Sequence, residues 1–117
     1  MAEFPTEITF RNMDHSEFVE KDIREKVAGL DRFSDRIHSC RVVVEASDHS
    51  HHKGNLYDVH ITLGVPGRDV VVTRAGRKNT AHEDVYVAVR DAFQAATRQL
   101  EDHARIARGD VKTHEAP

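Results

Sequence analysis

The sequence predicts an α+β domain in which one four-stranded sheet is covered on one face by two helices, in the order β-α-β-β-β-α. Three observations predict this class. Apolar residues recur at helical spacing in two segments, 18–33 and 85–100. Three segments between them read as strands, and a Pro-Gly pair separates the last two. A chain of 117 residues has room for one core, so we expect a single domain over 1–108 and a flexible tail or linker over 109–117.

The first strand and helix follow from short patterns near the N-terminus. Residues 7–12, "EITFRN", alternate polar and apolar residues, which predicts a strand. Asp14 and Glu17 resemble a capping box, and the apolar spacing that follows predicts a helix that continues to about Phe33.

Three strands are expected next. In 40–46 the β-branched run places Cys40 and every second residue after it on one face. In 56–63 apolar residues alternate with Asp58, His60 and Thr62. Pro66 and Gly67 form a turn signal before 69–74, which we expect to be the last strand.

The last helix has the clearest pattern. Thr80 and Glu83 form a capping box, and Gly109 provides a stop. Between them an apolar stripe predicts a helix of about 25 residues. Its members are Val85, Val89, Ala92, Phe93, Ala96 and Leu100.

Composition limits the class of protein. Charged residues make up 32% and aromatic residues 6%, which is typical of a water-soluble domain with a modest core. No run of roughly 18 apolar residues is present, and the N-terminus lacks a signal-peptide pattern. The single cysteine, Cys40, excludes an internal disulfide and fits the reducing cytoplasm, where we expect the protein to act.

A histidine-rich loop stands out at 47–55, "SDHSHHKGN". His49, His51 and His52 could ligate a metal, but no second pair of metal-ligating residues lies nearby. Cys40 cannot join them, because an extended strand places it roughly 30 Å away. A solvated hairpin loop and a contact with an anionic partner are the other two interpretations.

Enzymatic activity is not expected. The sequence contains no GxSxG, HExxH or GxxxxGK[ST] motif. Cys40 begins a predicted strand, where a thiol most often packs as a small apolar group. We therefore predict no catalytic residues, no cofactor, no resident metal and no small-molecule substrate.

Basic residues gather in one segment, 66–80, although the net charge is −3. Between residues 66 and 80 the basic residues Arg68, Arg74, Arg77 and Lys78 outnumber the one acidic residue, Asp69. Its last part, 74–80, is a loop that precedes a helix N-terminus, a position that favours anions. The capping box accounts for the backbone donors there but not for the four basic side chains.

A second basic group lies on the last helix. At 100° per residue, four arginines fall within an arc of about 80° beside the apolar stripe. Arginine suits phosphate oxygens because its donors form a planar fork. Glu101 intrudes into this arc, so an ordinary salt-bridged helix surface is the competing interpretation. The four are Arg90, Arg98, Arg105 and Arg108.

Residues 82–100, "HEDVYVAVRDAFQAATRQL", resemble the closing helix of the bacterial ribosome hibernation-promoting factor and ribosome-associated inhibitor family. The "HED-x-Y-x-A" opening and "RQL" are the most specific matches. "EITFRNMDHSE" and "VAGLDRFSDRI" resemble the family's first strand, the start of its first helix and that helix's end. The resemblance extends over 7–106.

The resemblance implies binding to the small ribosomal subunit and its ribosomal RNA, in the decoding channel, with inhibition of translation during stress or stationary phase. Family contacts are basic side chains on RNA phosphates, and Lys26, Arg32 and Arg98 match them. Gly29, Ala95 and Asp102 depart from family lysines. With the basic loop and helix residues above, the predicted RNA-binding set also includes Arg74, Arg77, Lys78, Arg90, Arg105 and Arg108, with His51, His52 and Lys53 as auxiliary contacts.

Two further expectations concern the rest of the protein. The tail "RGDVKTHEAP" resembles a junction that leads into a cold-shock domain in some longer relatives. We expect a monomer, with weak self-association through a strand edge as an option. The alternative functions are a protein-interaction module that kept the fold but lost the lysines, and weak metal binding by the histidine loop.

Overall fold

The computed structural model describes residues 4–33, 35–47, 56–67, 69–74 and 84–108. Within them the elements are β1 (Thr6–Arg11), α1 (Glu17–Ala28), the short 3-10 helix η1 (Asp31–Phe33), β2 (Ser39–Ser47), β3 (Leu56–Gly64), β4 (Val70–Arg74) and α2 (Val85–Arg108). The predicted order, β-α-β-β-β-α, is confirmed.

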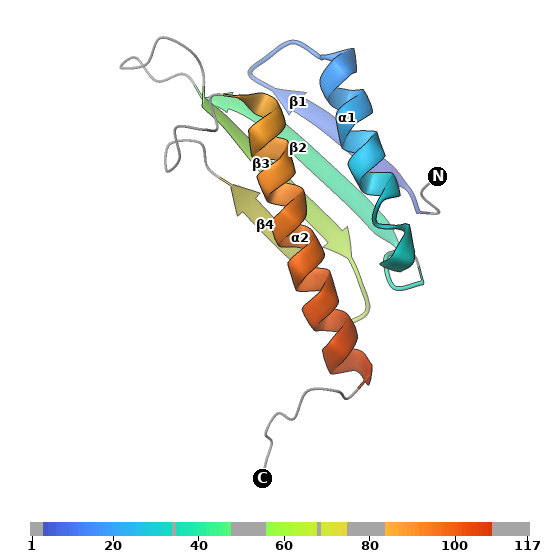
Figure 1. Cartoon of the computed structure of the whole chain (residues 1–117). Helices are drawn as coiled ribbons and strands as arrows, with labels where there is room; N and C mark the ends of the chain where they lie inside the picture. The colour runs from blue at the N-terminus through green and yellow to red at the C-terminus, as the bar shows by residue number, and fades with distance from the viewer. Residues whose placement is uncertain (1–3, 34, 48–55, 68, 75–83, 109–117) are drawn as a thin grey trace.

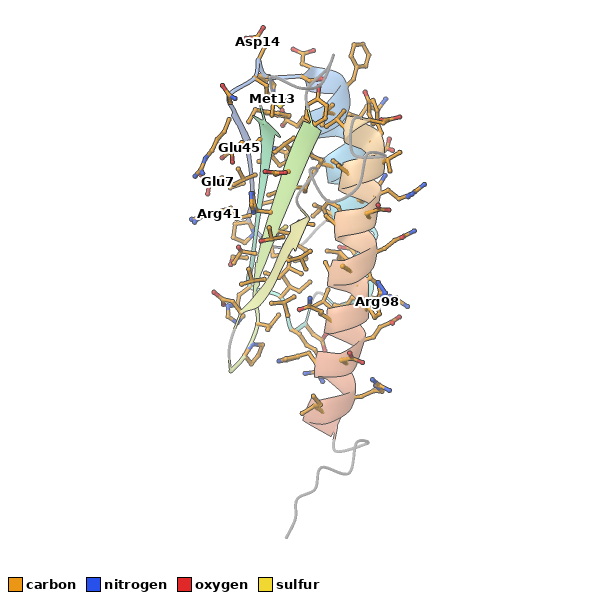
Figure 2. All side chains as sticks on the ribbon, turned by 90° about the vertical axis from the view of Figure 1, so that its left-hand side faces the viewer. Glu7, Met13, Asp14, Arg41, Glu45 and Arg98 are labelled. Atoms are coloured by element: carbon orange, nitrogen blue, oxygen red, sulfur yellow. The ribbon has the colours of Figure 1, made fainter. Side chains whose placement is uncertain are left out.

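The four strands form one mixed sheet in the order β1-β2-β3-β4. β1 pairs with β2 in parallel, and the two later pairs are antiparallel. Both helices lie on the same face of this sheet, and no described helix covers the other face, which we call the open face (Figures 1 and 2). The predicted fold class is therefore confirmed.

The strand register explains which side chains form the core. Ile8 aligns with Val42, Val42 with Ile61, and Ile61 with Val72, so one apolar row crosses the whole sheet beneath the helices. The next row, from Thr9 through Val43 and His60 to Thr73, faces the other way because side chains alternate along a strand.

The first helix is shorter than its periodicity predicts. Ser16, rather than the predicted Asp14 and Glu17 box, caps α1, and its hydroxyl accepts a hydrogen bond from the Val19 amide at 3.2 Å. The helix ends at Ala28, and the prediction that it reaches Phe33 is wrong. Leu30 and Phe33 are nevertheless buried, because the chain continues into η1 on the core side. Their burial explains why the apolar spacing of the sequence extends beyond the end of the helix.

The last helix begins at Val85, where Asp84 accepts a hydrogen bond from the Tyr86 amide at 2.9 Å. The predicted capping pair, Thr80 and Glu83, lies outside the described residues. α2 packs against β3 and β4 through a face that is rich in alanine. Its buried members include Ala88, Ala92, Ala95 and Ala96.

The turn between β3 and β4 behaves as predicted. Gly67, which follows Pro66, has a φ of +95°, a conformation that a side chain would disfavour. The turn reverses the chain and brings β4 back along β3.

We expect Leu100→Ala to lower the free energy of unfolding by about 3 kcal/mol, because Leu100 is 0% exposed and its loss leaves a cavity between α2 and the sheet. Urea denaturation would measure the change. Ile106→Ala is the matched control, since Ile106 lies on the same helix but is 60% exposed, and it should change stability by less than about 0.5 kcal/mol. Equal losses would contradict this packing.

Candidate nucleic-acid interface

The predicted arginine arc on the last helix is exposed. The alanine-rich face of α2 packs on the sheet, so the opposite side of the helix faces solvent. Arg90, Arg98 and Arg105 are exposed. In Figure 2, Arg98 extends from the outer side of α2, away from the sheet, whereas Arg41 lies on the far side of the sheet. Arg108 is the last residue of α2, and its side chain is outside the described set.

Two of these arginines are paired with carboxylates of their own helix. Arg90 donates to Asp91 Oδ1 from Nε at 3.2 Å and from Nη2 at 3.0 Å. Arg105 donates to Asp102 one turn earlier. Arg98, in contrast, makes no hydrogen bond or ion pair with any other described residue. The arc therefore combines one unpaired guanidinium with two that are partly neutralised.

The fold places Arg32, of η1, beside the C-terminal part of α2. Its Nη2 donates to Glu101 Oε2 at 3.0 Å, across 69 positions of sequence. Its guanidinium carbon also lies 4.7 Å from the ring centroid of Phe33, within the range of a cation-π contact. The ion pair with Glu101 places Arg32, which the sequence predicted to bind RNA, beside the arginine arc.

Lys26, on α1, is less available. Its ammonium group lies 3.0 Å from Asp22 Oδ1, and both side chains are about three-quarters buried. Nearby, Arg24 pairs with Glu20 at 2.9 Å. The hydrogen bond from His15, and then that from Arg24, lower the pKa of the Glu20 carboxyl. These four charged side chains of α1 are thus paired with one another.

The remaining predicted contacts cannot be placed. Arg74 ends β4, and only its backbone is described. Arg77, Lys78, His51, His52 and Lys53 lie outside the described residues, as does the histidine loop that carries the metal alternative. Across the part of the chain that the structure describes, no three His, Cys, Asp or Glu side chains lie close enough together to hold a metal ion.

Among the departures from the family pattern, Ala95 is informative. Its side chain is buried, so in this chain the position belongs to the core under α2 and not to the arginine arc. Asp102 is exposed and holds Arg105. These carboxylate partners of the arginines were not part of the predicted site, although the three-residue spacing of Asp102 and Arg105 is a recognised signal for a helical ion pair.

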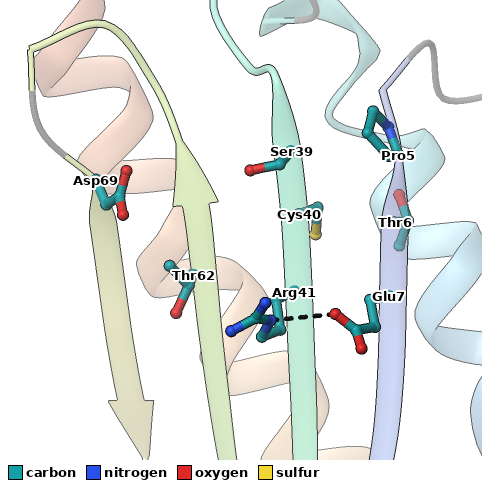
Figure 3. Close-up of a pocket in the computed structure, with 8 residues that line it drawn as sticks. All are labelled: Pro5, Thr6, Glu7, Ser39, Cys40, Arg41, Thr62 and Asp69. Carbon is teal, nitrogen blue, oxygen red and sulfur yellow. Dashed lines mark hydrogen bonds and ion pairs between the residues drawn. The ribbon is translucent and has the colours of Figure 1, made fainter.

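The open face of the sheet has a different character. A hollow of about 300 Å³ is lined there by residues of β1 and β2, with Thr62 and Asp69 beside them (Figure 3). Glu7 and Arg41 form an ion pair across its floor at 3.2 Å. Cys40 also lines it, but burial raises the pKa of this thiol to about 11. The thiol is therefore protonated at neutral pH and unsuited to nucleophilic attack.

The described helices share one further property. None of them is both long and apolar enough to cross a membrane.

Several solved structures share this fold, among them the following two. The ribosomal subunit interface protein from Coxiella burnetii superposes with a TM-score of 0.70 at 14% identity, over 86% of this chain and 98% of that chain. The N-terminal domain of Protein Y from Thermus thermophilus gives a TM-score of 0.63 at 21% identity, over 83% and 94%. At these identities the similarity concerns the fold. No curated protein matches the sequence significantly.

The fold is that of a small α+β domain, which these two proteins share. Residues 6–108 match the family of sigma 54 modulation protein / S30EA ribosomal protein, and the chain belongs to this family. The family resemblance predicted from the last helix is thereby confirmed. Its members are ribosome-associated modulators and not enzymes, in agreement with the prediction that this chain lacks catalytic activity.

Because the Cys40 thiol is 2% exposed and has a pKa of about 11, the folded protein holds this proton above pH 9, where the unfolded chain releases it. The free energy of unfolding should therefore fall as pH rises from about 9 to about 11, by roughly 2 to 3 kcal/mol. Denaturation at several pH values would measure this against Cys40→Ala, which should lack this part of the decline. An identical pH dependence in the two proteins would contradict it.

Proposed function

We propose that this protein is a cytoplasmic translation inhibitor that binds the small ribosomal subunit in its decoding channel and protects idle ribosomes under stress. The observation that carries the proposal is membership, over residues 6–108, of a ribosome-associated family. Basic side chains supply the affinity by contacting ribosomal RNA phosphates, with residues 1–108 as the binding domain.

The proposed contact surface is the outer side of α2 with the adjoining end of η1. Arg98 contributes most among the described residues, because its guanidinium is exposed and has no carboxylate to leave. Arg32, Arg90 and Arg105 contribute after exchanging their carboxylate partners for phosphates. Exposed ion pairs contribute at most about 1 kcal/mol, so replacing a carboxylate by a phosphate costs little free energy.

Further basic residues complete the proposed surface. Arg74, Arg77 and Lys78 lie between β4 and α2 in sequence, and Arg108 ends α2. Lys26 contributes on α1 once it leaves Asp22. His51, His52 and Lys53 are auxiliary contacts, whose charge increases as the histidines protonate below about pH 6.5. We expect the protein to act as a monomer.

A second candidate is a protein-interaction module of the same fold. It is favoured by the carboxylates that neutralise three of the arginines and by Val71, which is 58% exposed on the edge strand β4. An unpaired strand edge can pair with another chain. The two candidates differ in how binding depends on salt.

We expect binding to purified small subunits to weaken steeply with salt. If four arginines each neutralise one phosphate, the logarithm of the association constant should fall with the logarithm of salt concentration with a slope of about −3. Co-sedimentation at salt concentrations from about 50 to about 300 mM KCl would measure this slope. A slope near zero would favour the protein-interaction module and contradict the phosphate surface.

Arg98→Gln should weaken binding to small subunits by roughly tenfold at low salt, since it removes a charge-assisted contact. Arg41→Gln is the matched control, because it removes the same charge from the opposite side of the sheet (Figure 2) and should change affinity by less than about twofold. Replacing Arg90, Arg98 and Arg105 together with Glu should abolish co-sedimentation. Unchanged binding of the triple variant would remove α2 from the interface.

A further inference from the structure

A second hollow lies between η1 and the C-terminal part of α2, on the helical side of the molecule. Its volume is about 410 Å³, within the range of sites for small ligands. Its lining combines two arginines and two carboxylates with an apolar part made by Phe33 and Ala104. The charged members are Arg32, Glu101, Asp102 and Arg105.

Each guanidinium in this hollow is held by one carboxylate. Arg32 is bound to Glu101 at 3.0 Å, and Arg105 is bound to Asp102. All four side chains are at least half exposed, so water screens both pairs and neither is strong. The four charges sum to zero, and the hollow as it stands does not attract anions through its net charge.

The Arg32 side chain is nevertheless preorganised for a second acceptor. The Phe33 ring, 4.7 Å from the guanidinium carbon, limits where the guanidinium lies. Among the described residues, one of its five N–H groups is used, by Glu101. A phosphate can therefore be bound by the remaining donors, or can replace Glu101 and be bound by two of them side by side.

We propose that this hollow is a subsite for one phosphodiester group of RNA, and that Glu101 is the competing anion that lowers its affinity. The inference rests on the proposed function and adds to it a residue that opposes binding. Glu101 occupies the donor that a phosphate would use and adds like charge beside it. Asp102 has the same relation to Arg105, but it lies on the same helix turn, whereas Glu101 joins η1 to α2.

The first experiment compares Glu101→Gln with Glu7→Gln in co-sedimentation with small subunits at low salt. Each variant removes one negative charge and breaks one exposed ion pair with an arginine, at 3.0 Å for Glu101 and at 3.2 Å for Glu7. Glu7 lies on the open face of the sheet, beside Arg41 (Figure 3). We expect Glu101→Gln to bind about fivefold more tightly and Glu7→Gln to bind like the wild type.

The gain should depend on Arg32. In the double variant Arg32→Gln/Glu101→Gln the fivefold gain should disappear, because no guanidinium remains in η1 to bind the phosphate. Equal affinities for Glu101→Gln and Glu7→Gln, or a gain that survives the loss of Arg32, would overturn the subsite while leaving ribosome binding intact.

A readout without ribosomes separates the two proposals. The full chain, labelled with ¹⁵N, would be titrated with a single-stranded oligouridylate while the arginine Nε–Hε signals are followed by NMR. We expect the Arg32 and Arg105 signals to shift, and to do so at a lower RNA concentration in Glu101→Gln. Shifts in a protein that fails to co-sediment would support the subsite and overturn the ribosomal function. An unperturbed Arg32 signal would overturn the subsite.

Discussion

The packing of the alanine-rich face of α2 against β3 and β4 is the contact on which the rest of this structure depends. Alanine side chains allow close approach, and Leu100 of the same helix is fully buried in the core. Because this face is buried, the rotation of α2 about its own axis is determined. The arginine arc then has to face solvent on the far side of the helix.

The same packing creates the electrostatic character of the helical side. α2 is a single helix of 24 residues, so the arginines and the carboxylates between them form one continuous surface. The arginine side chains of these pairs are more than half exposed, so the pairs are weak. Under the proposed function, a phosphate of the ribosomal RNA would compete with the carboxylates already in place. The family relationship and the −3 net charge are then compatible, since affinity in this proposal depends on which pairs exchange and not on the sum of charges.

Much of the fold could be predicted because it rests on local patterns. The strand faces follow from alternation, as in the burial of Cys40, Val42 and Val44 on one side of β2. The turn at Gly67 follows from its need for positive φ. The end of α1 could not be predicted, because Leu30 and Phe33 are buried through a 3-10 turn that keeps them on the core side without continuing the helix.

The candidate site divides in a similar way. Sequence by itself determined the arginine arc of α2, since helical periodicity fixes the angles between residues of one helix, and it determined the family through the motifs of residues 82–100. Only the tertiary structure decided that Arg32 meets Glu101, because two residues 69 positions apart are brought together by the packing of η1 against α2. The tertiary structure also decided that Ala95 is buried and that Arg98 is unpaired among the described residues. Burial and ion pairing depend on neighbours from other elements and on side-chain directions, which helical periodicity does not encode.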